Sequence, residues 1–415
     1  MKKDYFKHNW CKLDNVAKVF SMDDQNNTNI FRYSVILKQN INKSILKKAV
    51  NKSLETYKSY KVKIGSGLFW NYLEYNSKEP IITKEDEIPC QHINFKRNNN
   101  YLFKITYYKN KINLDIFHVL TDGGGAKKFL KSIIYNYLSL KHKLEYIENK
   151  DNIGYQDQYL KNYDKSIKVK NDYKLAYQLP GKVNKNINNT YHYIIDLLKM
   201  KNICKEHKVT ITEYITALYI YSIYKSMYKK NTKKEISITL PIDLRKYYQV
   251  ETLSNFFVCA NINPKINENK LTTFKEILNQ VHLEFQEKLS IDNVKSYLTR
   301  DVKLGLNIPV RLVPLPMKKT FMKLILNIAS KTTTSTLSNV GIVDIDTKFK
   351  KYIDNILILV MPSKKEKMKC SICSYDKKLN ITINSKFDDT KFEHIFLRLL
   401  EKHLTNIKLE TNTNL

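Results

Sequence analysis

A histidine and an aspartate that stand four residues apart are the residues of this chain best suited to chemistry. The stretch FHVLTDGGGAKKFL, residues 117–130, places His118 and Asp122 directly before three of the chain's nine glycines. A neutral imidazole can take a proton near neutral pH, and a carboxylate can cap a helix. Taken singly, His118 could be a core histidine and Asp122 a simple N-cap. Their combination with the glycines indicates a catalytic turn instead.

A strand must lead into this turn and a helix must leave it. The segments LFKITYY and INLDIFH flank the short turn KNK and are typical of a β-hairpin. Ile112, Leu114 and Ile116 alternate on one face of the second strand, and His118 ends that face. After the glycines, apolar residues recur at helical spacing over 129–137. The glycines are expected to allow a sharp reversal and close backbone approach, because they lack a Cβ and accept positive φ.

The rest of the chain predicts a mixed α/β protein. Helical spacing appears over residues 43–57 and 209–228. Buried strands are predicted in EISITLPIDL, which should stop at Pro241, and in NFFVCANIN, NILILVMP and KLNITINS. With 415 residues, the chain exceeds the usual size of a single core. The polar stretch at residues 179–192 is the best linker, and it divides the chain into halves 1–180 and 190–415.

Charge and cysteine usage narrow the classes of function. The net charge is +31, but the lysines are scattered, which favours a diffuse solvated surface over a nucleic-acid site. Six dispersed cysteines and the absence of a secretory signal favour free thiols and a cytoplasmic location. Cys370 and Cys373 form a C-x-x-C, but MKCSICSYD is typical of a strand and no second ligand pair follows, so no metal site is expected. No apolar run approaches the ~20 residues of a membrane span.

Four segments resemble one enzyme superfamily, in the family's order. HVLTDGG resembles the His-x-x-x-Asp-Gly signature of the CoA-dependent acyltransferases. These include chloramphenicol acetyltransferases, peptide-synthetase condensation domains, and the alcohol acetyltransferases close to the mycobacterial polyketide-associated acyltransferases. NWCKLDNVAKVF is similar to the opening of the alcohol acetyltransferase group. LPIDLRKYYQVETLSNFF resembles the Pro-x-x-x-Arg and Asn-Phe segment, and TLSNVGIVDI resembles the Ser-Asn-x-Gly segment.

The departures from the family pattern also carry information. Many condensation domains have two adjacent histidines, whereas Phe117 stands at the first of these positions, which favours an acyltransferase over peptide condensation. No second complete motif occurs in the other half. The resemblance implies an α/β (α+β two-layer) fold, in which two chloramphenicol-acetyltransferase-like halves form a V with the active site in a tunnel between them.

The resemblance implies an acyl-CoA-dependent O-acyltransferase similar to the alcohol acetyltransferases. An acyl group would pass from acyl-CoA, such as acetyl-CoA, to a hydroxyl-bearing small molecule, with no bound cofactor. His118 would be the general base of a direct attack, so the rate should fall on the acid side within roughly pH 5–8. Asp122 and Gly123 complete the catalytic motif. Asp122 would form a structural ion pair with Arg245.

The resemblance implies further site residues, each of which has an alternative role. Ser338 and Asn339 are oxyanion donor candidates by family position, although TTTSTLSNVG alone could be a polar loop. Backbone N–H groups near Gly124 are the alternative donors. Asn255 could shape the tunnel or simply lie at a strand edge.

Three rival interpretations remain open. The donor could be an acyl carrier protein, whose acidic surface would suit a basic chain. The protein could instead bind nucleic acid or an anionic membrane, since residues 310–331 contain a basic amphipathic stretch, although a helix covering the core explains that stretch as well. A degenerate, non-catalytic family member is the third possibility, and the intact motif residues count against it.

Overall fold

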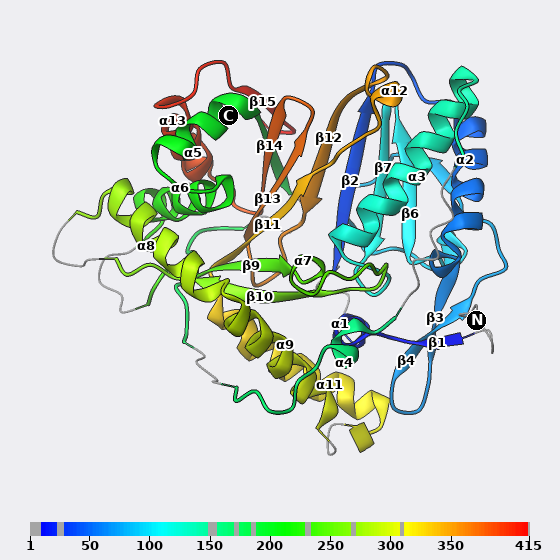
Figure 1. Cartoon of the computed structure of the whole chain (residues 1–415), viewed down its shortest axis with the longest axis horizontal. Helices are drawn as coiled ribbons and strands as arrows, with labels where there is room; N and C mark the ends of the chain where they lie inside the picture. Colours follow the sequence, from blue (N-terminus) through cyan, green and yellow to red (C-terminus); the bar gives the residue numbers. More distant parts are fainter. Residues whose placement is uncertain are drawn as a thin grey trace.

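Two lobes lie side by side in the computed structural model, one built mainly from the first part of the chain and the other mainly from the second (Figure 1). The structure describes residues 10–22, 29–147, 156–169, 174–183, 188–228, 234–266, 271–307 and 311–413. Each lobe has its own sheet and its own buried core. The predicted α/β fold class is confirmed.

The first lobe holds a five-stranded sheet in the order β12-β2-β7-β6-β5. Its strands are β2 (Ile30–Leu37), β5 (Ile82–Lys84), β6 (Phe103–Tyr108), β7 (Lys111–Phe117) and β12 (Ile353–Val360). Helices α2 (Lys43–Thr56) and α3 (Gly123–His142) pack on the core of this sheet. The predicted hairpin is confirmed, because β6 and β7 pair up to Tyr108 and Lys111 around a two-residue turn.

A late segment of the chain completes the first lobe. Strand β12 pairs antiparallel with β2, so that Ile356 lies opposite Val35. Val343, Ile345 and Phe349 join the same core. The first core therefore contains residues from both sides of the linker at 179–192, and the two lobes share one continuous fold.

The second lobe holds a seven-stranded sheet in the order β10-β9-β11-β13-β14-β8-β15. Its strands are β8 (Asn189–Asp196), β9 (Ile238–Asp243), β10 (Phe257–Ile262), β11 (Ser335–Ile342), β13 (Met368–Tyr375), β14 (Lys378–Ser385) and β15 (Lys408–Thr411). The helices around its core are α5 (Leu197–Glu206), α6 (Ile211–Ser226), α8 (Phe274–Lys288) and α13 (Lys391–Glu401). The predicted helix over 209–228 is confirmed as α6, and the C-x-x-C lies in β13, as its strand pattern predicts.

The predicted end of a strand at Pro241 is wrong. Strand β9 continues to Asp243, and Pro241 lies opposite Cys259 of β10. On its other side β9 pairs with β11 only at Ile238 and Thr239. Proline is tolerated where a strand has a neighbour on one side alone, because its missing N–H then interrupts no second ladder.

Smaller elements lie around the two sheets, and several of them lie below (Figure 1). A three-stranded sheet contains β1 (Trp10–Lys12), β3 (Val62–Ser66) and β4 (Asn71–Tyr75). The remaining helices are α1 (Asn15–Phe20), α4 (Gln158–Lys161), α7 (Arg245–Tyr248), α9 (Ile291–Leu306), α11 (Leu315–Ala329) and α12 (Thr347–Lys350), with 3₁₀ turns at Lys58–Tyr60, Lys96–Asn98 and Ser330–Thr332. Within the described ranges, no helix has the length and apolar character needed to span a bilayer.

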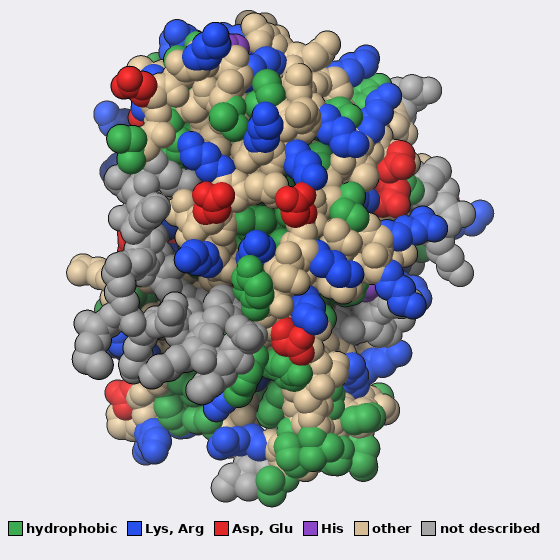
Figure 2. All heavy atoms as spheres, turned by 90° about the vertical axis from the view of Figure 1, so that its right-hand side faces the viewer, with side chains coloured by type: hydrophobic (Ala, Val, Ile, Leu, Met, Phe, Trp, Pro, Cys, Tyr) green, Lys and Arg blue, Asp and Glu red, His purple; other side chains and the backbone are tan. Residues whose placement is uncertain are grey.

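Charge is spread rather than gathered on the face that the first lobe forms. On the face formed by the first lobe, Lys and Arg side chains are scattered, and hydrophobic side chains gather along the lower edge (Figure 2). This distribution on one face agrees with the diffuse charge that the sequence predicts.

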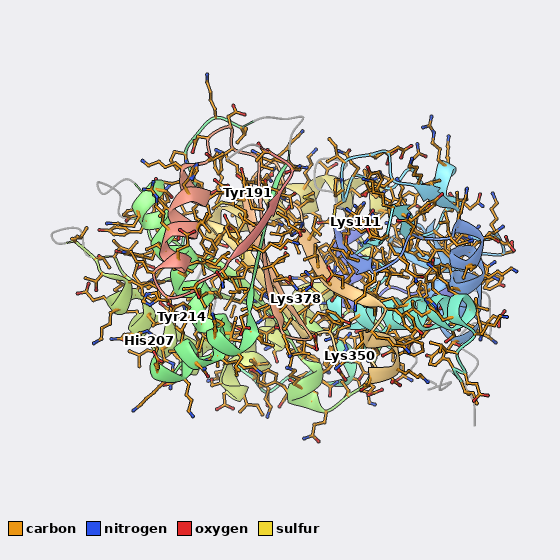
Figure 3. The ribbon with its side chains drawn as sticks, turned by 90° about the horizontal axis from the view of Figure 1, so that it is seen from above. Lys111, Tyr191, His207, Tyr214, Lys350 and Lys378 are labelled. Carbon is orange, nitrogen blue, oxygen red and sulfur yellow. The ribbon has the colours of Figure 1, made fainter. Side chains whose placement is uncertain are left out.

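Polar contacts join the two lobes along β12 and β14. Seen from above, Lys111 lies in the first lobe, Tyr191 and Tyr214 lie in the second, and Lys378 lies between them (Figure 3). The Lys378 ammonium lies 3.0 Å from the Asp354 carboxylate of β12. In the same two strands, the buried side-chain amides of Asn355 in β12 and Asn380 in β14 exchange hydrogen bonds of 2.9 and 3.0 Å. The lobes are thereby fixed relative to each other on one side of the cavity described next.

Candidate active site

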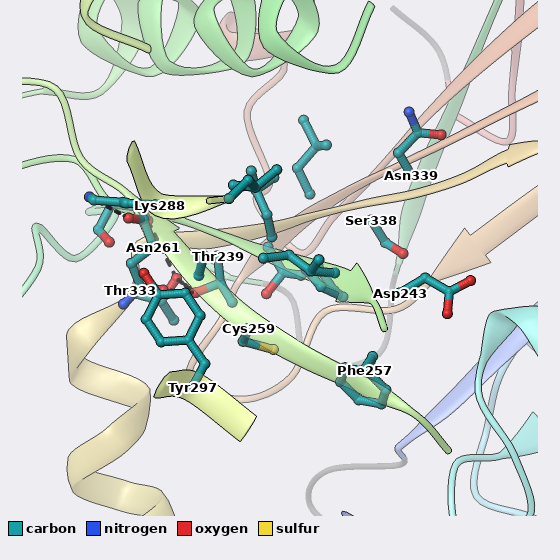
Figure 4. Close-up of a pocket in the computed structure, with 18 of the residues that line it drawn as sticks. Thr239, Asp243, Phe257, Cys259, Asn261, Lys288, Tyr297, Thr333, Ser338 and Asn339 are labelled. Atoms are coloured by element: carbon teal, nitrogen blue, oxygen red, sulfur yellow. Dashed lines mark hydrogen bonds between the residues drawn. The ribbon is translucent and has the colours of Figure 1, made fainter. Parts of the chain in front are cut away.

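A cavity of about 2110 Å³ is lined by residues from both lobes. Its wall includes six residues that the sequence singles out: His118, Asp122, Gly123, Arg245, Ser338 and Asn339. Ser338 and Asn339 lie near Asp243 on one side of the close-up in Figure 4, and Lys288 and Tyr297 lie on the other. A single small ligand usually occupies a cavity of roughly 300–1,000 Å³, so this one has room for two substrates.

His118 follows β7 directly and is held among aromatic rings. Its backbone N–H donates to the carbonyl of Asn29 over 2.9 Å. The imidazole centroid lies 4.5 Å from that of Phe31, 4.9 Å from that of Phe20 and 5.9 Å from that of Phe257. Burial lowers the pKa of His118 to about 4. The ring is therefore neutral throughout pH 5–8, and the expected acid-side fall in rate moves below that range.

Asn255 lies behind His118, outside the wall of the cavity. Its Nδ2 donates to the His118 carbonyl over 2.9 Å and to the Asp14 carboxylate over 3.0 Å. Because both contacts need an amide donor, they fix the orientation of the amide and turn Oδ1 toward the ring. Asn255 Oδ1 lies 3.5 Å from His118 Nδ1, at the long end of the hydrogen-bond range.

Asp14 is a site residue that sequence reasoning missed. It is fully buried, caps α1 by accepting from the Ala17 N–H over 2.7 Å, and also accepts from the Asn255 N–H over 3.2 Å. Burial raises its pKa to about 7. An aspartate before a short helix indicates only an N-cap, so no local signal pointed to a partner 241 positions away.

Asp122 is both the N-cap of α3 and an ion-pair partner. Its Oδ1 accepts from the N–H groups of Gly124 and Gly125 over 3.0 and 3.1 Å. The Arg245 guanidinium donates to both carboxylate oxygens, over 2.9 and 3.0 Å, and the Phe256 N–H donates to Oδ2 over 2.8 Å. Burial alone would raise the pKa of Asp122, but Arg245 and the N–H donors hold it below its ordinary value. The cap and the ion pair therefore occur together.

Close approach, not positive φ, explains the glycine cluster. A Cβ on Gly124 would lie 2.9 Å from Arg245 Nη1, and a Cβ on Gly125 would lie 2.8 Å from the Leu253 carbonyl. The expected positive φ is wrong here, because all three glycines form the first turn of α3. Since the N–H groups of Gly124 and Gly125 already donate to Asp122, they are poor candidates for oxyanion donors.

Ser338 and Asn339 belong to β11 where its pairing with β13 becomes irregular. The Asn339 amide donates to the Thr212 hydroxyl over 2.8 Å and accepts from the Gly341 N–H over 2.8 Å. Asn339 thus holds the irregular strand against α6. The Ser338 hydroxyl makes no hydrogen bond to another described residue, so it is the freer donor of the two.

Several cations line the cavity, and some of them have a carboxylate partner. Lys288 and Arg300 pair with Glu284 and Asp301. The ammonium of Lys127 instead donates to backbone carbonyls of β11, and Lys246 lies near enough to Lys127 to help lower its pKa, of which burial is the larger cause. Neither lysine forms an ion pair within the described ranges. In the same ranges, no group of three or more His, Cys, Asp or Glu could hold a metal ion.

Comparison with known proteins shows which fold this is. No family model matches the sequence, and no curated protein matches it. Polyketide synthase associated protein 5 from Mycobacterium tuberculosis is 13% identical, with a TM-score of 0.62 over 94% of this chain and 96% of that one. The trichothecene 15-O-acetyltransferase TRI3 from Fusarium sporotrichioides is 10% identical, with a TM-score of 0.62 over 95% of both chains.

A condensation domain is equally similar. The starter condensation domain of rhizomide synthetase, in a mutant form with C8-CoA and Leu-SNAC, is 10% identical, with a TM-score of 0.62 over 95% of this chain and 94% of that one. These likenesses, at such low identity, establish the fold. The chain has the fold shared by the CoA-dependent acyltransferases and condensation domains, as the sequence resemblance predicted.

The Asp122 carboxylate should stabilise the protein far more than an ordinary helix cap does. Asp122→Asn leaves the buried Arg245 without its full partner, and breaking a buried pair typically costs about 3–5 kcal/mol. Asp196→Asn is the matched control, because Asp196 caps α5 at an exposed position and asparagine caps about as well as aspartate. Urea unfolding of both variants would measure the difference. Equal, near-neutral effects would contradict the structural role of the pair.

Proposed function

We propose that the protein is an acyl-CoA-dependent O-acyltransferase that moves an acyl group from a thioester to the hydroxyl of a small molecule. The observation that carries the proposal is a half-buried histidine, held neutral among aromatic rings, in the wall of a cavity with room for both substrates. The fold supports it, because similar structures include an O-acetyltransferase and a condensation domain in complex with an acyl-CoA. The predicted cytoplasmic location is part of this proposal.

The proposed reaction needs no covalent enzyme intermediate. With Nδ1 turned to Asn255, Nε2 of His118 is the nitrogen left to take the proton of the acceptor hydroxyl. The acceptor oxygen attacks the thioester carbonyl and forms the new C–O bond. When the tetrahedral intermediate collapses, the C–S bond breaks, and the proton passes from His118 to the leaving thiolate. The products are the ester and free CoA.

We assign the developing oxyanion to Ser338, whose hydroxyl is a donor on the cavity wall. Asn339 has a supporting role, because its amide already holds β11 against α6. Lys127 and Lys246 are the proposed contacts of the donor phosphates, because they line the cavity close to the glycine turn and a lysine ammonium makes strong charge-assisted hydrogen bonds to phosphate.

The proposal is tested by incubating the protein with a panel of acyl-CoAs and alcohols and measuring the release of free thiol. Turnover with a CoA thioester supports it. Turnover only with acylated carrier protein would favour the carrier-dependent alternative, and salt-dependent nucleic-acid binding without thermal protection by CoA would favour a binding protein.

His118→Ala should abolish most of the activity without unfolding the protein. A general base typically contributes ~10²–10⁴-fold, and that is the expected loss in kcat. His192→Ala is the matched control, because burial also lowers the pKa of His192 to about 4, yet its ring bonds to Thr382 in the second sheet, outside the cavity. Near-wild-type turnover of the His118 variant would refute the assignment.

The pH profile of the Asp14→Asn variant tests the same base independently, because the buried Asp14 carboxyl, whose pKa is raised to about 7, no longer titrates in it. Because burial favours the neutral ring, kcat/KM of this variant should stay flat from pH 8 down to about pH 5 and fall as His118 protonates near pH 4. Far-ultraviolet circular dichroism at each pH separates this fall from acid unfolding. An acid limb centred near pH 6.5 would show that the ring is more hydrated than its aromatic contacts imply.

Asp14 should act through Asn255 as a positioning residue. Asp14→Asn retains one carbonyl acceptor but cannot serve both the Ala17 N–H and the Asn255 amide as the carboxylate does, so kcat should fall while KM changes little. A double-mutant cycle with Asn255→Ala provides the decisive measurement. If Asp14 acts through Asn255, its effect on kcat disappears in the Asn255→Ala background, whereas a purely structural effect would add.

A further inference from the structure

Helix α11 exposes most of its large apolar side chains to solvent. Of its residues 315–329, only Leu315 and Lys318 are buried. The exposed fractions are 66% for Met317, 57% for Phe321, 57% for Leu324 and 65% for Ile328. A surface helix ordinarily turns its apolar stripe inward. The interpretation of this segment as a helix that covers the core is therefore incorrect.

A buried lysine fixes this inverted orientation. The Lys318 ammonium lies 3.6 Å from the centroid of a Trp70 ring and donates to the Phe69 carbonyl over 2.9 Å. Burial lowers the pKa of this lysine. One turn earlier, the Leu315 N–H donates to the Leu68 carbonyl over 2.8 Å. Helix α11 is thus attached to the β3–β4 hairpin by its polar contacts, and its apolar residues are left outside.

The hairpin extends the apolar surface of the helix. Residues 317, 321, 324, 325 and 328 recur at helical spacing and form one stripe along α11. The exposed side chains of Leu68, Phe69 and Leu312 lie next to the start of that stripe. We call these eight residues the outer apolar face. Hydrophobic side chains gather along the lower edge of the molecule in Figure 2, the edge at which α11 and the β3–β4 hairpin lie in Figure 1.

The charges around this face favour an anionic lipid surface over a second copy of the chain as its partner. Residues 311–331 contain five cationic residues and no Asp or Glu. Lys319 and Lys323 are exposed on the side of α11 that faces away from the stripe, because each stands two residues from Phe321 and a helix turns by about 100° per residue. A second copy of the chain would oppose basic face to basic face, and each chain carries a net charge of +31. An anionic lipid surface instead attracts the lysines and accepts the apolar side chains.

We propose that the outer apolar face docks the protein on an anionic lipid bilayer. Helix α11 lies in the plane of the interface, with Phe321 and Leu324 among the acyl chains, and the net charge of +31 attracts the protein to the anionic headgroups. The tip of the β3–β4 hairpin enters beside it. This binding does not depend on acyl transfer, and it requires no helix that spans the bilayer.

Flotation of the full-length protein with vesicles tests the proposal. Wild-type protein should float with vesicles of phosphatidylcholine and phosphatidylserine, and much less with phosphatidylcholine alone. The double variant Phe321→Asp with Leu324→Asp should bind the anionic vesicles more than about tenfold more weakly, since burial of even one large apolar side chain is worth that much. Unchanged thermal unfolding would show that the exposed substitutions leave the fold intact.

A matched variant separates the effect of the outer apolar face on vesicle binding from the effect of the net charge. Leu140→Asp with Leu198→Asp changes the net charge equally at two exposed leucines on α3 and α5, and it should bind like wild type. Equal weakening of both double variants, or no wild-type binding to anionic vesicles, would overturn the proposal. Loss of a concentration-dependent dimer in the α11 variant, measured by analytical ultracentrifugation without vesicle binding, would instead assign the face to a second copy.

Discussion

The buried Asp122 carboxylate holds elements of the two lobes together at one point. Five N–H donors converge on it: the backbones of Gly124, Gly125 and Phe256, and two from Arg245. A buried carboxylate is tolerated only when its charge is compensated, so these elements must meet at one point. Because Asn255 precedes Phe256, the same constraint brings Asn255 to His118. The ion pair therefore positions the proposed base without touching it.

Burial of the His118 ring does more than keep it neutral. An imidazole with an ordinary pKa is already mostly neutral at pH 7, so lowering the pKa to about 4 adds little unprotonated base and weakens its basicity. Phe20, Phe31 and Phe257 must therefore provide something else. These packed aromatic rings place apolar surface beside the imidazole. In the proposed reaction, such a surface would leave less room for water next to a bound thioester and would favour transfer to the acceptor over hydrolysis.

The sequence predicted what depends on local spacing and missed what depends on distant contacts. The helices over 43–57 and 209–228 and the hairpin before His118 follow from periodicity and turn residues. The course of β9 through Pro241 depends on where β11 stops pairing, and the return of β12 to the first sheet depends on long-range pairing. The contact of Asp14 with Asn255 joins two distant segments, neither of which signals the other. The shifted pKa of His118 likewise depends on distant rings.

Helix α11 connects the outer surface to the cavity. Leu326 and Ala329 line the cavity, whereas Phe321 and Leu324 belong to the outer apolar face. The same helix therefore borders both the reaction space and the solvent. If a bilayer covers the outer face, the cavity wall next to α11 lies at the lipid interface. An acceptor alcohol that partitions into lipid would then be concentrated beside the cavity, and its apolar part would meet apolar side chains on both sides of one helix.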